Sequence, residues 1–275
     1  MARLMRWLIC AVIVLAFAPG AYADDLDILR GTQTVGPATF PKWSGFYFGG
    51  QIGYSDVSAD FSNSTQTPIA YVLRNSTLEQ TSQPSQLPTL GTADHGGTAY
   101  GGFVGYNTQW QDLILGIETN YNHTSLTLNA PSSPIARSSF SDGSGNTYTI
   151  GIAAAGTLTD LDYGSLRARA GWVLGNFLPY GFVGLAVGHA DVQVAAGVAG
   201  TCDAGSTPAC EPFSFSAAAG GSSTWLYGFT VGGGLDIALT QNIFLRGEFE
   251  YIRFAQVYNI PIAITSARAG AGFKF

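Results

Sequence analysis

The residue types best suited to nucleophilic chemistry in this sequence are a histidine and a serine two positions apart, His123 and Ser125. Side chains two apart in a β-strand lie on the same face, so a strand would hold this pair together. A serine becomes an effective nucleophile when a histidine accepts its proton and an acid orients that histidine. The sequence identifies no such acid for this pair, so we predict no catalytic residue and no enzymatic activity.

We also predict no metal or cofactor site, and the cysteines favour a structural role. Cys202 and Cys210 are spaced C-x7-C in a segment rich in Ala, Gly, Thr and Pro, which suits a small disulfide-closed loop. A zinc site would need closer cysteine spacing and a second pair of ligands. Glycine runs such as Gly232–Gly234 do not open a helix after a strand, as a dinucleotide-binding loop must.

The elements that would position side chains are β-strands, because apolar residues recur with a period of two. Leu115 and Tyr121, for example, share one face of such a segment, whereas Glu118 lies on the other. The apolar segments are long enough to supply the roughly 9–11 residues that a tilted membrane strand requires. The eight predicted strands fall at 43–54, 98–108, 115–122, 164–174, 180–190, 225–237, 245–251 and 267–275.

The connections between these strands alternate between short turns and longer polar loops, a pattern typical of an outer-membrane β-barrel. The turns fall near 109–112, 175–178 and 240–242, and the loops span 58–97, 125–160, 192–222 and 255–262. An even number of strands puts both chain ends on the side of the short turns, facing the periplasm. The sequence thus predicts an all-β fold, an eight-stranded antiparallel up-and-down transmembrane β-barrel with long extracellular loops.

The composition fits this class and argues against others. Charged residues make up 11% of the chain, against about 25% in a soluble domain. The net charge of −6 argues against a nucleic-acid partner, which needs a basic surface. A soluble β-sandwich or lipocalin-like barrel is the alternative fold, but it would place polar residues on the water-facing side of each strand. Here that side carries largely Gly, Ser and Thr, which suit a narrow barrel interior.

Ionisable side chains gather on the face opposite the apolar one, which would be the barrel lumen. Unpaired charges in a narrow lumen are very unfavourable, so these groups must pair or reach water. An eight-stranded barrel is just wide enough for side chains to fill, which favours a salt-bridge plug over a selective pore. A small conductance stays open as the alternative, because the lumen also holds many glycines. The predicted lumen charge network consists of Glu118, Arg167, Arg169, Asp236, Arg246, Glu248, Glu250 and Arg268, with Lys274 on the same face.

The start of the chain predicts export across the inner membrane. Two arginines precede an apolar run, and an Ala-Tyr-Ala sequence typical of a cleavage site ends at residue 23. The apolar run, about 12 residues, is short for a membrane-spanning helix. We therefore expect a cleaved signal peptide over 1–23, a flexible periplasmic segment over 24–43 and the barrel over 44–275.

Three stretches of the chain carry a family resemblance. Trp43–Tyr54 fits the pattern W-x-G-x-Y-x-G-x-x-x-G-Y, Leu178–Gly184 reads LPYGFVG, and Gly232–Tyr251 holds two strand patterns joined by a turn. Together they resemble the outer-membrane immunogenic protein family, opacity-antigen-like porins related to the OmpA transmembrane barrel. The resemblance covers about residues 43–275, although the long first loop and the cysteine-bearing third loop depart from the typical member. It implies a structural outer-membrane protein, a surface antigen or a small porin of Gram-negative type, and it carries no catalytic motif.

Two other features resemble motifs of known outer-membrane proteins. The terminal residues Phe273 and Phe275 resemble the assembly signal read by the barrel-assembly machinery, and they would equally suit an aromatic girdle. His123 and Ser125 are similar to the His-Ser pair of outer-membrane lipid A deacylases, but the asparagine that follows the serine there is Leu126 here.

We expect a monomer in the cell outer membrane, surrounded by outer-membrane lipid and lipopolysaccharide. Its expected function is structural, namely to stabilise the outer membrane and display its loops as a surface antigen. A small diffusion porin and a loop-mediated adhesin are the alternatives.

Overall fold

The computed structural model describes residues 41–133, 135–141, 145–202 and 211–275. The predicted signal peptide and most of the predicted periplasmic segment lie outside the described residues. The helices are α2 (Gln66–Leu73), α3 (Thr77–Ser82) and the short 3-10 helix η1 (Pro84–Gln86). The strands are β1 (Gly45–Asp60), β2 (Thr92–Trp110), β3 (Leu113–Asn129), β4 (Ile135–Ser141), β5 (Thr147–Trp172), β6 (Phe177–Cys202), β7 (Phe213–Ala238), β8 (Ile243–Phe254) and β9 (Ile262–Lys274).

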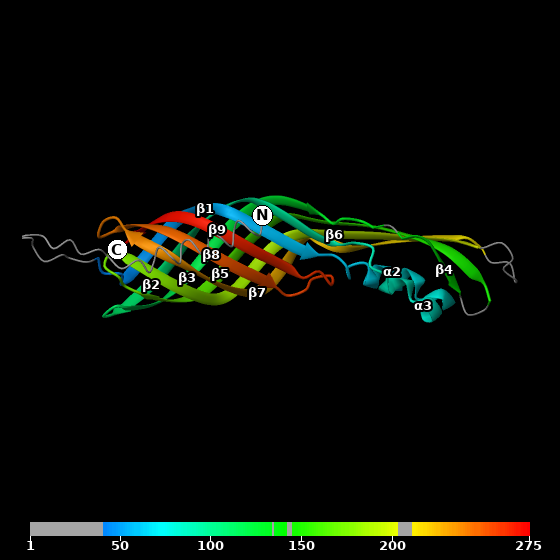
Figure 1. Ribbon diagram of the computed structural model, residues 1–275, viewed down its shortest axis with the longest axis horizontal. Helices are drawn as coiled ribbons and strands as arrows, with labels where there is room; N and C mark the ends of the chain where they lie inside the picture. The colour runs from blue at the N-terminus through cyan, green and yellow to red at the C-terminus, as the bar shows by residue number, and fades with distance from the viewer. Residues whose placement is uncertain (1–40, 134, 142–144, 203–210) are drawn as a thin grey trace, which may run out of the picture. The chain divides into compact units, whose positions relative to one another are not determined.

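Among the described strands, eight close into an antiparallel barrel (Figure 1). Apart from β3 and β4, strands that are neighbours in sequence pair with one another. The pairings of β1 with β9 and of β3 with β5 complete the ring. Short connections at 111–112, 173–176 and 239–242 join strands at one end, which we call the turn end. The first and last strands also meet there, where the amide of Phe275 donates to the carbonyl oxygen of Phe46 at 3.0 Å. The predicted fold class, strand number and up-and-down topology are confirmed.

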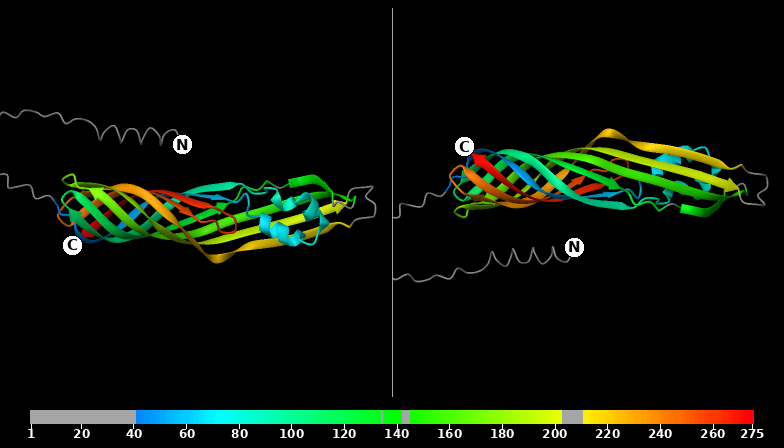
Figure 2. Two further views of the ribbon diagram at one scale, coloured as in Figure 1. Left: turned by 90° about the horizontal axis from the view of Figure 1, so that it is seen from below. Right: turned by 90° about the horizontal axis from the view of Figure 1, so that it is seen from above.

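Strands β5, β6 and β7 are much longer than a membrane crossing needs. Each has 26 residues, against the roughly 9–11 that suffice for a tilted strand. Their surplus residues continue past the barrel and, with β4 paired to β5, form a sheet that we call the extension (135–141, 147–159, 192–202 and 213–221; Figure 2). The prediction of loops at 125–160 and 192–222 is therefore wrong for most of their described residues.

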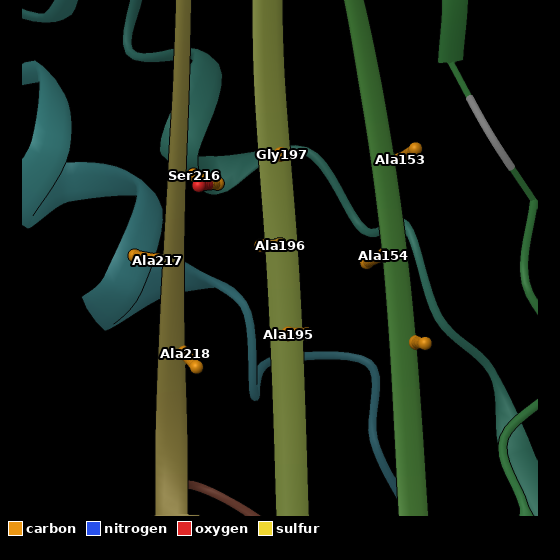
Figure 3. A pocket seen from close by; sticks show the side chains of 9 residues that line it. Ala153, Ala154, Ala195, Ala196, Gly197, Ser216, Ala217 and Ala218 are labelled. Carbon is orange, nitrogen blue, oxygen red and sulfur yellow. The ribbon is translucent and has the colours of Figure 1, made fainter.

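The composition of the extension explains why it resembles a loop in the sequence. Small side chains from three adjacent strands line a shallow pocket on this sheet (Figure 3). Alanine and glycine give no strong alternation of hydrophobicity, so the period of two is lost although the backbone stays paired. The lining residues are Ala153, Ala154, Ala155, Ala195, Ala196, Gly197, Ser216, Ala217 and Ala218.

A layer of helices from the first predicted loop covers one face of the extension (Figure 2). Ile69 and Leu73 of α2 and Leu78 of α3 are buried against its apolar side chains. The hydroxyl of Ser76 caps α3 by accepting the amide of Leu78 at 3.1 Å. No helix in the described ranges is long and apolar enough to cross a membrane.

A row of irregular pairings marks the junction between barrel and extension. The β3–β5 register shifts between Thr124 and Thr127, so that two residues of β3 face the single residue Asp160 of β5. Asp160 has a φ of 48°, and similar shifts follow between β5 and β6 and between β6 and β7. β-bulges of this kind bend strands and are common at barrel rims. They let the curved barrel wall continue into a flatter sheet.

Candidate functional site

An apolar band surrounds the barrel on its outer surface. Ile52, Ile117 and Leu185 are each at least 60% exposed, although water would disfavour all three. Exposed aromatic side chains border the band at both ends. They are Tyr54, Tyr100, Tyr121, Trp225 and Tyr227 toward the extension, and Trp110, Trp172 and Phe275 at the turn end. A band flanked by aromatic girdles is the lipid-facing surface of a membrane barrel.

All eight charges of the predicted lumen network point inward and are at most 5% exposed. Arg167 of β5 lies between acids from two walls of the barrel. Its guanidinium binds Glu118 of β3 and donates to Glu248 of β8 at 2.8 Å. It also reaches Glu250 at 3.3 Å. Sequence separations of 49 and 81 residues between Arg167 and its first two partners mean that these ion pairs tie distant strands together.

A second group of pairs lies beside the first. Arg169 donates to Asp236 at 2.8 Å and to Glu118 at 3.1 Å. Arg246 lies 2.8 Å from an oxygen of each of the same two acids. Arg268 completes the network by contacting Glu248 and Glu250 at 2.5 Å each. Every arginine of the network therefore contacts at least two carboxylates.

Neutral side chains make further contacts with some of these ions. The hydroxyl of Tyr47 donates to Glu118 at 2.7 Å, and that of Tyr180 donates to Glu248 at 2.9 Å. The Arg246 guanidinium stacks 4.0 Å above the ring of Phe103. A buried ion pair is tolerable only when further hydrogen bonds satisfy its donors and acceptors. Removing one partner from such a network leaves an uncompensated buried charge.

Apolar layers close the lumen on both sides of the charges. At the turn end, Trp43, Ile114 and Phe244 belong to one buried cluster. Toward the extension, an amide layer of Gln51, Asn120 and Asn122 comes first, with Gln51 donating to Asn122 at 2.6 Å. A larger buried cluster follows and fills the rest of the barrel. It includes Val57, Phe61, Leu126, Leu158, Leu161, Val192, Leu226, Ile252, Phe254, Ile262 and Ile264.

This apolar upper lumen is not predicted from the sequence. Leu126, Leu158 and Val192 come from segments expected to be loops, for which the sequence predicts no inward or outward face. Their inward position makes this half of the lumen resemble the core of a soluble protein. Lys274, which shares the inward face of β9, lies at the turn end and donates from Nζ to the carbonyl oxygen of Lys42.

The histidine and serine of β3 acquire an acidic neighbour in the fold. Asp162 lies directly opposite His123 in the β3–β5 pairing. Its Oδ1 is 2.5 Å from Nδ1 of His123, and Nε2 of that ring is 3.0 Å from Oγ of Ser125. The pairing register that creates this contact depends on the long β3–β5 connection, so spacing along the sequence does not reveal it.

The remaining predicted site residues are the two cysteines and the two phenylalanines near the C-terminus. Cys202 ends β6, whereas Cys210 lies outside the described residues, so their disulfide stays a prediction. Phe273 and Phe275 are both exposed at the turn end, and their ring centroids are 5.2 Å apart. No group of three or more metal-binding side chains occurs among the described residues.

A closed barrel with a lipid-facing band and a side-chain-filled lumen defines this chain as an outer-membrane β-barrel protein. The sequence matches the family described as outer membrane protein beta-barrel domain over residues 10–275. The chain belongs to this family, which confirms the resemblance to OmpA-like outer-membrane barrels. Membership also supports a location in the outer membrane.

Solved structures of similar proteins share low sequence identity with the chain. Neisserial surface protein A (NspA) is 17% identical, with 84% of this chain and 98% of that chain covered and a TM-score of 0.39. Ail, the attachment invasion locus protein of Yersinia pestis, is 13% identical over 84% and 99% of the two chains, with a TM-score of 0.34. The N-terminal beta-barrel domain of Pseudomonas aeruginosa OprF is 12% identical over 82% and 97%, with a TM-score of 0.34. No curated protein matches the sequence.

Proposed function

We propose that this chain is a structural outer-membrane barrel and surface antigen, whose lumen is a permanent plug and whose extension stands outside the cell. The observation that carries the proposal is the filled lumen. Four arginines and four acids interlock across it, and apolar clusters lie on either side. In this structural role, the side chains of the lumen carry out no enzymatic reaction.

The same observation disfavours the small-porin alternative. A conducting pore must bind ions weakly enough for them to leave, along a continuous wet path. Here each lumen arginine already holds carboxylates at hydrogen-bonding distance, and an ion that crossed would also have to pass the apolar clusters. Adhesion through the extension is a second candidate role, because the helix-covered sheet is a large folded surface at the end of the barrel opposite the short turns.

The proposed role includes export and assembly. A signal peptide over 1–23 would be cleaved on export, and both chain ends would then face the periplasm. Phe273 and Phe275 would be read by the barrel-assembly machinery, and outer-membrane lipid and lipopolysaccharide would surround a monomer. The exposed terminal rings at the turn end support this arrangement.

Deletion of the gene that encodes this chain tests the structural role. We expect increased uptake of a hydrophobic fluorescent dye, because the outer membrane is less well sealed, and unchanged uptake of small hydrophilic solutes. Re-expression of the chain without residues 66–86, which leaves the barrel strands intact, should restore the barrier. Slower uptake of hydrophilic solutes in the deleted strain would instead support the porin role and contradict the proposal.

A further inference from the structure

The outer wall of the barrel carries a serine, a histidine and an aspartate in hydrogen-bonding order. His123 of β3 lies between the other two, with Nδ1 2.5 Å from Asp162 Oδ1 and Nε2 3.0 Å from Ser125 Oγ. The three side chains are held by regular elements, because Asp162 is the cross-strand partner of His123 and Ser125 follows two residues along β3. None of the three belongs to the lumen network.

The order of these contacts is the one that activates a serine. A carboxylate bound at Nδ1 keeps the ring proton on that nitrogen and leaves the lone pair of Nε2 free. Nε2 is then placed to accept the hydroxyl proton of Ser125, which makes Oγ a nucleophile. Such triads occur on unrelated folds and are identified by geometry and role.

The surroundings of the triad point to the substrate. The side chains face outward, and the ring of Tyr100 lies 5.2 Å from the His123 imidazole. Tyr100 and Tyr121 are 58% and 55% exposed and belong to the aromatic girdle toward the extension. Girdle aromatics lie at the boundary between lipid headgroups and acyl chains, which is also the depth of the acyl ester bonds of membrane lipids.

A β-bulge lies beside Ser125 in β3. Ser125 and Leu126 together face the single residue Asp160, so the ladder is locally broken beside the nucleophile. Attack on an ester needs a hydrogen-bond donor for the negative charge that develops on the carbonyl oxygen, and this irregular backbone lies beside Ser125, where such a donor would act. Ile117 and Leu166, 62% and 58% exposed further down the wall, offer an apolar surface for the acyl chain.

We propose that Ser125, His123 and Asp162 form a hydrolytic triad that cleaves acyl esters of lipids in the surrounding membrane leaflet. Oγ of Ser125 bonds to the ester carbonyl carbon while its proton moves to Nε2 of His123. The carbon–oxygen bond to the lipid alcohol then breaks, and the alcohol leaves with that proton. Water attacks the acyl-serine, gives a proton to Nε2 and releases a fatty acid, and the proton returns to Oγ. The reaction consumes only water, and it goes beyond the structural role because it does not depend on a closed lumen.

The test uses the refolded full chain in two kinds of vesicle, with folding confirmed by a heat-dependent gel shift. One kind contains phosphatidylethanolamine and phosphatidylglycerol, and the other also contains lipopolysaccharide. We expect fatty acid release in at least one. Release from the first kind identifies glycerophospholipid as the substrate, and release only from the second identifies the lipid A portion of lipopolysaccharide.

Variants separate the triad from contaminating activity. Ser125→Ala should abolish release, and Asp162→Asn should lower the rate by about 10⁴-fold because the imidazole loses its orienting carboxylate. His189→Asn is the matched control, since His189 is the partner of Asp162 on the other side, in β6, and should leave the rate unchanged.

A fluorophosphonate probe gives an independent measurement that needs no lipid substrate. Its phosphorus should bond to Oγ of Ser125 with loss of fluoride, so that the folded chain is labelled and the Ser125→Ala variant is not. The proposal is overturned if the folded chain neither takes the label nor releases fatty acid from either vesicle. It is also overturned if Ser125→Ala remains as active as the parent.

Discussion

At the scale of single residues, the lumen depends on mutual compensation between buried charges. Arg167 is 1% exposed and contacts Glu118, Glu248 and Glu250. Desolvation of such groups costs several kcal/mol per ion, and only their partners offset that cost. Arginine suits this position because its planar guanidinium donates in several fixed directions at once.

Replacement of Arg167 should therefore destabilise the folded barrel strongly. We expect Arg167→Gln to lower the free energy of unfolding by about 3–5 kcal/mol, because it leaves buried carboxylates without their positively charged partner. Urea unfolding of the refolded chain in lipid vesicles measures this change. The exposed Arg253→Gln is the control and should change stability by roughly 0.5 kcal/mol or less.

A second substitution tests the cause of that loss. Adding Glu118→Gln to Arg167→Gln should cost less than the sum of the two single changes, because the carboxylate left without its partner is itself removed. Equal stabilities for Arg167→Gln and Arg253→Gln would show that the network contributes little.

At the scale of elements, the sequence predicts the barrel strands well because lipid and lumen impose opposite chemistry on alternate residues. Ile117 and Glu118 are adjacent yet 62% and 2% exposed, so the period of two is strong there. The alanine-rich strands of the extension lack this contrast between alternate residues. The contact between His123 and Asp162 is not predicted for another reason, since it depends on the pairing of β3 with β5 across a long connection.

The helix layer should be stable only through its packing on the extension. Helices α2 and α3 have 8 and 6 residues, too short to persist alone. Leu73→Ala should destabilise this layer by about 2–5 kcal/mol, since Leu73 is 1% exposed. Faster protease cleavage within residues 61–91, with an unchanged gel shift of the barrel, would be the expected result.

Tyr71→Ala provides the matched control for the helix layer. Tyr71 is 63% exposed on the same helix, so its removal should leave the cleavage rate nearly unchanged. If the Leu73→Ala and Tyr71→Ala variants were cleaved equally fast, packing on the extension would not stabilise α2.

The orientation of the elements across the membrane is open to chemical labelling. Ala195 is exposed on the extension, and Asn176 lies in the turn between β5 and β6. A membrane-impermeant maleimide should label Ala195→Cys on intact cells and Asn176→Cys only after the outer membrane is permeabilised. The parent chain measures any background from its own cysteines, and the reverse pattern would invert the proposed topology.

At the scale of the whole molecule, successive layers of side chains fill the barrel lumen, so no open channel runs through it in the part of the chain that the structure describes. An apolar cluster at the turn end, the ionic network, an amide layer and a second apolar cluster follow one another through the lumen. Eight strands leave an interior that side chains can fill. The sequence predicts the ionic layer, whereas the apolar layer toward the extension follows only from strands that continue beyond their expected ends.

Single-channel conductance of the refolded chain in a planar bilayer tests the closed lumen most directly. With folding confirmed by the gel shift, the filled lumen predicts a silent bilayer at all applied voltages. The double variant Glu248→Gln with Arg167→Gln should mainly lose stability. Discrete, reproducible openings of the parent chain, with an ion preference that shifts in this variant, would contradict the plug and establish a charged pore.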